Sequence, residues 1–365
     1  MRFRHELDLI KSYEAGKPIE LVVREFGIEP GDVVKLASNE NPFGPSPKAR
    51  EKVAALAGQM HRYPDDSFFA LKGGLAQKYG VESGNVIIGS GSDQIFEFIS
   101  HALLERGDTV LQNRVTFAMY AIYTAQVGAK TVTTQSDLHD LGQFETLMNQ
   151  HKPKLIYLCT PSNPAGDALD GDAVFDFLRK VDPQTLVVVD AAYMEYAAAK
   201  DPKKRIDPKR LIETFPNAIY TGTFSKAYGL GGMRVGYGIA SREVITALHK
   251  MRPPFNITTL SLAAAIEALA DEAFVQQGIA HNFKEMTRYE AFAKEMGLGY
   301  IESYTNFIAL LFPEDKSATD MAQTLLKEGV IVRDLKSYGL NAIRVSMGLT
   351  PENDRFFDRF KANWR

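Results

Sequence analysis

The order of apolar and polar positions between residues 81 and 240 predicts short strands that alternate with amphipathic helices. Short apolar runs rich in Val and Ile recur along this stretch and are bounded by charged residues or glycine. The predicted strands lie at 86–88, 109–111, 131–133, 155–158, 186–189, 218–220 and 235–239. The predicted helices lie at 94–105, 119–127, 143–151 and 173–181. Such alternation is typical of an α/β fold with a mostly parallel sheet covered by helices.

The pattern changes after residue 250. The break Arg252-Pro-Pro-Phe255 is followed by two long predicted helices, at 257–270 and 274–296. Further strands at 307–311, 330–332 and 343–346 then surround a helix at 317–327. We therefore expect a smaller α+β C-terminal domain. The predicted division is an N-terminal arm at 1–28, a large domain at 29–250 and a small domain at 251–365.

Composition narrows the class of protein. The 365 residues are 45% apolar, which suits about two domains with buried cores. With 42 basic and 45 acidic residues the net charge is −3, so nothing favours a nucleic-acid partner. No apolar run reaches the ~18 residues of a membrane span. A lone cysteine, Cys159, excludes an intramolecular disulfide and is expected to be buried, which favours the cytoplasm. No pair of histidines has the spacing of a metal site.

A candidate for covalent chemistry is Lys226, in the stretch Thr-Gly-Thr-Phe-Ser-Lys-Ala-Tyr-Gly-Leu-Gly-Gly-Met-Arg at 221–234. A lysine amine can bind an aldehyde cofactor covalently. Ser225 and Arg234 beside it suit the phosphate of such a cofactor. A lysine by itself is more often solvated surface, so its neighbours carry the argument.

Three further polar residues follow predicted strands. Asp190 ends the run 186–190, Tyr193 comes three residues later, and Asn163 lies in Pro-Ser-Asn-Pro-Ala-Gly at 161–166. Ligands of open α/β sheets collect at the carboxyl ends of the strands. Taken singly, Asp190 also fits a helix cap and Tyr193 a packed aromatic.

The turn between the predicted strand at 86–88 and the predicted helix at 94–105 is a second candidate for binding an anion. Gly91, Ser92 and Asp93 stand between a predicted strand and the helix that follows, where backbone N–H groups can bind a phosphate. An ordinary capped turn is the alternative. A dinucleotide fingerprint fits poorly, because Gln94 stands where its third glycine belongs. Phe117, after the next strand, is a candidate to stack on a cofactor ring.

Read in order, these residues resemble the pyridoxal-phosphate site of the fold-type I aminotransferases. Within that superfamily the chain is most similar to the histidinol-phosphate aminotransferase subgroup, nearly from end to end. The matching segments are SYEAGKP at 12–18, ASNENPFG at 37–44, RYP at 62–64, IVR at 331–333 and IRVSMG at 343–348. Departures are Ser162, Ala165, Val115 and Ala191, where Asn, Thr, Pro and Glu are usual, and none removes an atom that the chemistry requires.

The resemblance implies a fold-type I architecture, pyridoxal 5'-phosphate as cofactor and amino transfer between histidinol phosphate and 2-oxoglutarate. Lys226 would anchor the cofactor and move a proton, and Asp190 would pair with its ring nitrogen. The residues implied to face the substrate are Tyr13, Asn39, Arg333 and Arg344. Tyr63 would reach the cofactor phosphate of a neighbouring subunit, which implies a homodimer.

Three alternatives stay open at this point. An aromatic aminotransferase and a threonine-phosphate decarboxylase share the fold, and the decarboxylase also needs an anion pocket. A non-catalytic ligand sensor is the alternative from another class. Such a regulator normally carries a DNA-binding extension, and about thirty residues before the fold are too few for one.

Overall fold

A mixed sheet lies at the centre of the molecule, which the computed structural model describes over residues 1, 3–10 and 18–364. Within these residues its seven strands follow the order β2-β8-β7-β6-β5-β3-β4. β8 runs antiparallel to both neighbours, and the other neighbouring pairs run parallel. The strands are β2 (Val86–Gly89), β3 (Thr109–Gln112), β4 (Lys130–Thr133), β5 (Leu155–Cys159), β6 (Leu186–Asp190), β7 (Ala218–Thr223) and β8 (Gly236–Ala240). The expected mostly parallel sheet is confirmed.

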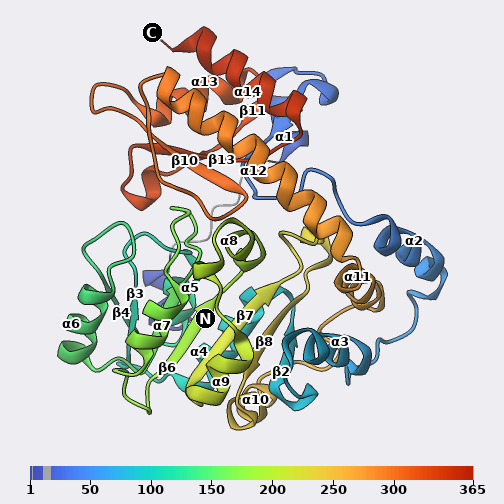
Figure 1. The fold of residues 1–365 in the computed structure, drawn as a ribbon, viewed down its shortest axis with the longest axis vertical. Coiled ribbons are helices and arrows are strands. Elements are labelled where there is room, and N and C mark those ends of the chain that lie inside the picture. Colours follow the sequence, from blue (N-terminus) through green and yellow to red (C-terminus); the bar gives the residue numbers. More distant parts are fainter. Residues whose placement is uncertain (2, 11–17, 365) are drawn as a thin grey trace.

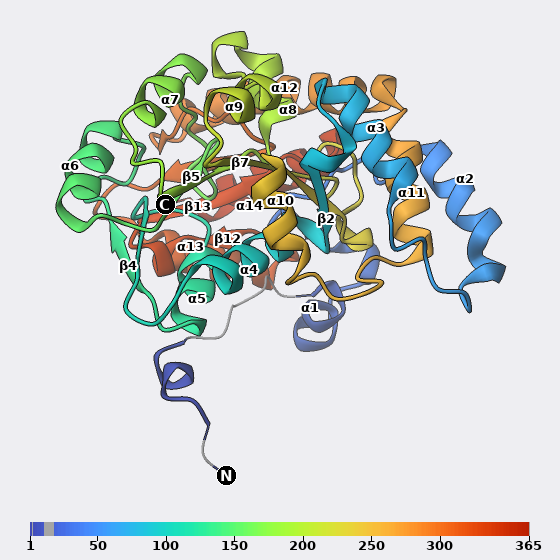
Figure 2. The ribbon, with the colours of Figure 1, turned by 90° about the horizontal axis from the view of Figure 1, so that it is seen from below.

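Helices cover both faces of this sheet, and β2, β5, β6, β7 and β8 are buried along their whole length. In β6, Val187 and Val189 pack into one layer, whereas Leu186 and Val188 pack into the other. The first layer contains α3 (Phe69–Tyr79), α6 (Leu141–His151), α7 (Gly171–Leu178), α8 (Met194–Lys200), α9 (Pro208–Thr214) and α11 (Thr259–Leu269). The second contains α4 (Gly91–Leu103), α5 (Met119–Gln126) and α10 (Arg242–His249). Figure 2 shows α7 and α9 on one side of the sheet and α4 and α5 on the other.

The C-terminal part has its own antiparallel sheet, in the order β12-β13-β10-β9. Its elements are β9 (Gly299–Tyr300), β10 (Phe307–Leu311), β12 (Arg333–Asp334), β13 (Ala342–Ser346), α13 (Ala318–Lys327) and α14 (Thr350–Asn363). The long helix α12 (Glu272–Glu295) joins the two cores (Figure 1). Val275 and Ile279 pack in the core of the large sheet, and Tyr289 and Phe292 pack in the C-terminal core.

The N-terminal segment lies against the C-terminal part. After α1 (Ile19–Phe26), strand β1 (Val34–Lys35) pairs in parallel with β11 (Val330–Ile331). The chain then returns to the large part, where α2 (Pro47–Leu56) packs on α11. The domain limits at residues 28 and 250 stay predictions. Among the described residues, no helix combines the length and apolar character needed to cross a membrane.

Candidate active site

One pocket at the carboxyl ends of the central strands collects most of the predicted site residues. Those that line it are Gly91, Ser92, Asp93, Phe117, Asn163, Asp190, Tyr193, Ser225, Lys226 and Arg234. Cys159, Ala192 and Thr223 are also in its lining. A larger cavity of about 630 Å³, near α3, α8 and the start of α12, contains none of them. The pocket is therefore the place where the predicted chemistry can occur.

The turn between β2 and α4 presents backbone N–H groups to this pocket. Gly91, Ser92 and Asp93 open α4, and the first N–H groups of a helix have no partner inside it. Gly91 has φ +76°, a conformation that favours glycine, and a Cβ there would lie 2.6 Å from Nη2 of Arg234 and would displace that guanidinium. Nη1 of Arg234 donates to Oγ of Ser225 at 3.2 Å. N–H groups, a hydroxyl and a guanidinium thus converge as they do in phosphate sites.

Lys226 lines the same pocket with a partly buried side chain. Its Nζ donates to the carbonyl oxygen of Ser38 at 3.5 Å, a long contact. Burial and the positive charges of Arg344 and Arg234 lower the pKa of Lys226 to about 8. Near neutral pH a far larger fraction of this amine is unprotonated than of a surface lysine, and only the unprotonated amine is a nucleophile or a base.

Asp190, at the end of β6, is a buried carboxylate with 4% of its surface exposed. It accepts hydrogen bonds from the Tyr120 hydroxyl, from the Ala192 N–H at 3.2 Å and from Thr221 Oγ1 at 3.4 Å. Burial raises the pKa of Asp190 to about 6. In the described part of the chain no cationic side chain forms an ion pair with it. A cation bound in the pocket would therefore stabilise its ionised form.

Hydrogen bonds orient the two other polar residues of the pocket. Nδ2 of Asn39 donates to the Tyr193 hydroxyl at 2.9 Å, which leaves the hydroxyl proton of Tyr193 free to be donated elsewhere. The carboxamide oxygen of Asn39 accepts from Oγ of Ser346. Nη1 of Arg344 donates to Oδ1 of Asn163 at 2.6 Å, so the Nδ2 amide of Asn163 is the group left to donate.

The two candidate arginines for the substrate lie side by side. Arg333 of β12 and Arg344 of β13 are direct partners in the antiparallel register, so their side chains leave the same face of the sheet. Two like charges in this position disfavour each other, and an anion between them relieves the repulsion. Arg344 is 8% exposed and also donates from Nη2 to the Ala37 carbonyl at 2.6 Å.

Of the predicted residues that the structure describes, Asn39, Tyr63, Arg333 and Arg344 are not in the lining of the pocket. Tyr63 is 82% exposed, and its ring stands 4.7 Å from that of Phe255, itself 44% exposed. Neither residue lines the pocket of its own chain. Tyr13 falls outside the described residues.

Comparison with known proteins identifies the family. Residues 31–359 match the family described as aminotransferase class I and II. The chain is 59% identical over 358 residues to histidinol-phosphate aminotransferase from Wolinella succinogenes, with 98% of both chains covered. It is 57% identical over 357 residues to the Sulfurimonas denitrificans enzyme of the same name, again with 98% of both chains covered. The chain belongs to the class I and II aminotransferases, in the histidinol-phosphate aminotransferase family.

A solved structure agrees with this family membership. The fold is similar to that of histidinol-phosphate aminotransferase from Sinorhizobium meliloti in complex with pyridoxal-5'-phosphate, with a TM-score of 0.89 and 27% identity over 99% of this chain and 98% of that one. The expected fold-type I architecture of this aminotransferase is thereby confirmed. The roles given to single site residues stay predictions.

Two tyrosines that donate hydrogen bonds to predicted site residues, Tyr120 and Tyr123, were not predicted from the sequence. Tyr120 donates to Asp190 and stacks on Tyr157, with ring centroids 4.1 Å apart. Tyr123, one helical turn later, donates to Oδ2 of Asp93 at 3.0 Å. Their only signal was a spacing of three residues on a predicted helix, which is common in any helix that packs on a sheet.

Proposed function

We propose that this aminotransferase transfers the amino group of L-histidinol phosphate to 2-oxoglutarate, giving imidazole-acetol phosphate and L-glutamate in histidine biosynthesis. The observation that carries the proposal is the pocket that combines Lys226, an anion-binding turn and the buried carboxylate of Asp190. The 59% identity to a histidinol-phosphate aminotransferase across 98% of the chain supports the choice of substrate.

The pocket residues fit pyridoxal phosphate as cofactor. The converging N–H groups of 91–93, Ser225 and Arg234 suit its phosphate, and the Asp190 carboxylate suits its ring nitrogen. Phe117 lines the pocket and is the residue we assign to the ring face. When bound, pyridoxal phosphate supplies an aldehyde that links to amines and a ring that withdraws electrons from the bonds at the substrate's Cα.

Lys226 is the residue we assign to proton movement. Its amine is held beside the pocket wall with a pKa lowered to about 8 by burial and by neighbouring cations. Once a substrate amine has displaced it, the free amine would be placed to take the proton from the substrate's Cα and to deliver it to the C4′ carbon of the cofactor, and the opposite half-reaction would use the reverse transfer. A surface lysine, with a pKa near 10.4, would be protonated and unable to accept that proton.

Tyr193 and Asn163 are assigned to the ring oxygen of the cofactor. Tyr193 has its hydroxyl proton available because Asn39 already donates to its oxygen. Asn163 has its amide N–H available because Arg344 occupies its oxygen. Two donors at one phenolate stabilise negative charge there. Asn39, predicted to face the substrate, would then also act through Tyr193.

Arg333 and Arg344 are assigned to the anionic ends of the two amino donors. One pocket must accept the phosphate of histidinol phosphate and the carboxylate of glutamate in turn. Guanidinium groups bind both anions with paired hydrogen bonds. The register that places the two arginines opposite each other supports a shared anion site.

The proposal includes a cytoplasmic homodimer. Met60, Tyr63 and Phe69, which are close in the sequence, are 69%, 82% and 83% exposed, and a second copy covering them would remove their apolar surface from water. This arrangement would bring Tyr63 toward the neighbouring pocket. The lone cysteine remains the basis for the expected cytoplasmic location.

Product analysis tests the proposed reaction. The purified protein is incubated with histidinol phosphate and 2-oxoglutarate, and the products are quantified by mass spectrometry. We expect glutamate and the phosphorylated ketone in equal amounts, and neither product from a Lys226→Ala protein purified in the same way. In a parallel incubation with threonine phosphate, release of CO2 without formation of glutamate would instead identify a decarboxylase.

A further inference from the structure

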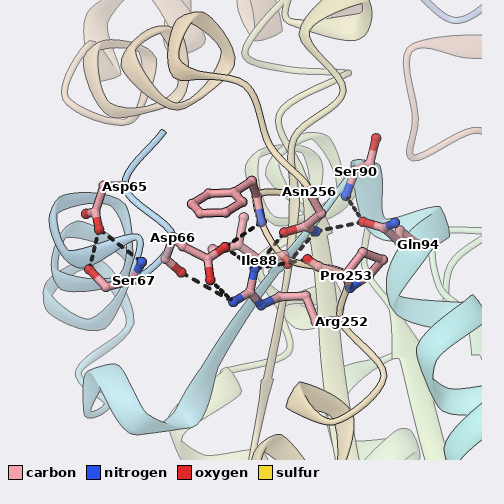
Figure 3. Close-up of polar contacts among 10 residues, drawn as sticks. Asp65, Asp66, Ser67, Ile88, Ser90, Gln94, Arg252, Pro253 and Asn256 are labelled. Atoms are coloured by element: carbon pink, nitrogen blue, oxygen red, sulfur yellow. Dashed lines mark hydrogen bonds and ion pairs between the residues drawn. The ribbon is translucent and has the colours of Figure 1, made fainter. Parts of the chain in front are cut away.

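A hydrogen-bonded network outside the pocket centres on Arg252, in the segment between α10 and α11 (Figure 3). Nη1 and Nη2 of Arg252 donate to the two carboxylate oxygens of Asp66, at 2.7 and 2.8 Å. These hydrogen bonds lower the pKa of Asp66 to about 2. Nη1 also donates to Oδ1 of Asn256 at 3.0 Å, and the guanidinium lies 4.9 Å from the ring centre of Phe68. The side chain of Arg252 is therefore held on several sides.

The network continues to the start of α4. Nδ2 of Asn256 donates to Oε1 of Gln94 at 2.8 Å and to the Ile88 carbonyl at 3.4 Å. The same Oε1 accepts from the Ser90 N–H at 2.8 Å. Backbone groups fix both amide orientations, because the Ser90 N–H can only donate and the Ile88 carbonyl can only accept. Figure 3 shows this line of contacts from Asp66 to Ser90.

Ser90 matters because it immediately precedes the N–H groups assigned to the phosphate. It is the N-cap residue of α4, yet its hydroxyl makes no capping hydrogen bond. The N–H groups of 91–93 are thus left for a ligand, and Gln94 holds the turn from behind by its bond to the Ser90 N–H. Gln94 in turn has its oxygen oriented by Asn256, from a segment more than 160 residues away.

The same network restrains two strained positions. Phe68 and Phe255 both have φ +55°, which is unfavourable for bulky residues. The Phe255 N–H donates to Oδ1 of Asp66 at 2.7 Å, so the Asp66–Arg252 pair fixes the backbone on which Asn256 stands. A side chain mounted on a restrained backbone keeps its hydrogen-bond geometry.

We propose that Arg252 and Asn256 are positioning residues for the cofactor phosphate, acting through Gln94 on the turn at 90–93. Arg252 holds Asn256, Asn256 orients the amide of Gln94, and Gln94 fixes the Ser90 N–H. This inference rests on the proposed function, because the ligand concerned is the phosphate of pyridoxal phosphate. Neither residue lines the pocket, so neither touches the cofactor.

Comparison of pyridoxal phosphate with pyridoxal, which lacks the phosphate, tests the inference on cofactor-free protein. Asn256→Asp keeps the acceptor for Arg252 but replaces the donor that faces Gln94 by an acceptor. We expect the dissociation constant of pyridoxal phosphate to rise about tenfold and that of pyridoxal to stay unchanged, because only the phosphate uses the turn. An unchanged ratio of the two dissociation constants, whether both stay the same or both rise by the same factor, would overturn the inference.

Asp66→Asn gives a second variant, which weakens the hold on Arg252 and should shift the ratio in the same direction by a smaller factor. Asp32→Asn is the matched control, because it removes an ion pair of 2.7 Å with Arg355 in another part of the molecule. It should leave the ratio unchanged. If wild-type protein fails to prefer pyridoxal phosphate over pyridoxal, the proposed function itself is wrong. If wild type shows the preference and both network variants have the same ratio of the two constants as wild type, only the positioning role is wrong.

Discussion

The carboxyl group of Asp190 is buried among Tyr120, Ala192 and Thr221, and burial raises its pKa to about 6. In the absence of a cationic ligand, ionisation of this group above pH 6 works against folding. A ring nitrogen that carries a proton would reverse the effect by favouring the carboxylate. We therefore expect Asp190 to reduce the stability of the empty protein and to favour binding of the cofactor.

Stability measurements on cofactor-free protein test this explanation. The folded pKa of Asp190 lies above its ordinary value of 3.8, so its contribution to stability is full below about pH 4 and is lost as pH rises through 6. Relative to wild type, Asp190→Asn should therefore become more stable between pH 4 and 6, by up to about 3 kcal/mol, and level off above. Urea unfolding across this range provides the measurement. A difference independent of pH would contradict the raised pKa.

The two arginines lead to different expectations for the two half-reactions. Arg333→Ala should slow the half-reaction of histidinol phosphate by roughly 10–150-fold, since one charge-assisted hydrogen bond to a desolvated anion contributes about 1.5–3 kcal/mol. The glutamate half-reaction should be affected much less, because the smaller carboxylate of glutamate is expected to depend mainly on Arg344. Arg344→Ala should impair both, because Arg344 also holds Asn163 and the Ala37 carbonyl. Single-turnover rates with histidinol phosphate and with glutamate as amino donor measure these effects. An equally small effect of Arg333→Ala on the rates of both half-reactions would contradict a role for Arg333 in the site.

At the scale of elements, the short apolar runs along the chain were sufficient to predict the strands of the central sheet. The buried runs of β5 and β6 contain only apolar residues before Cys159 and Asp190, and such runs can be read without a structure. The pairing of β1 with β11 could not be read, because strands of two residues have no periodicity. The contact of Tyr120 with Asp190 could not be predicted either, because the two residues are 70 positions apart and no local pattern links them.

In the proposed site, the turn between β2 and α4 holds the cofactor phosphate, so cofactor binding should depend strongly on this element. A Cβ at Gly91 would meet Nη2 of Arg234 at 2.6 Å, whereas a Cβ at Gly107, which also has positive φ, would meet no atom within 4 Å. Both Gly91→Ala and Gly107→Ala should lower stability by about 1–2 kcal/mol through backbone strain. Only Gly91→Ala should also weaken binding of pyridoxal phosphate. Titration of the cofactor-free variants measures this, and equal affinities would argue against a phosphate site at the turn.

At the scale of the whole molecule, α12 links two cores, and the pocket lies beside their junction. Asn39 and Arg344 come from the side of the C-terminal sheet, whereas Tyr193 and Asn163 come from the large sheet. The site therefore depends on the relative placement of both parts. In the proposed dimer, the exposed Tyr63 would add a contribution from a second copy.

Mixing two impaired variants tests the contribution across the interface. If Tyr63 serves the neighbouring pocket, a heterodimer of Tyr63→Phe and Lys226→Ala chains has both lesions in one site and an intact second site. Random exchange should then restore up to about a quarter of wild-type activity, measured at low cofactor concentration. Demonstrated exchange without recovery would mean that Tyr63 acts in its own subunit or has no role in the site.

Covalent attachment of the cofactor to Lys226 is the central claim, and borohydride reduction tests it most directly. Reduction of the protein loaded with pyridoxal phosphate should fix the cofactor irreversibly to the amine that holds it, and peptide mapping by mass spectrometry locates that amine. The label should appear on the peptide that contains Lys226, with loss of activity in proportion to labelling. A label on any other lysine, with Lys226 unmodified, would contradict the account.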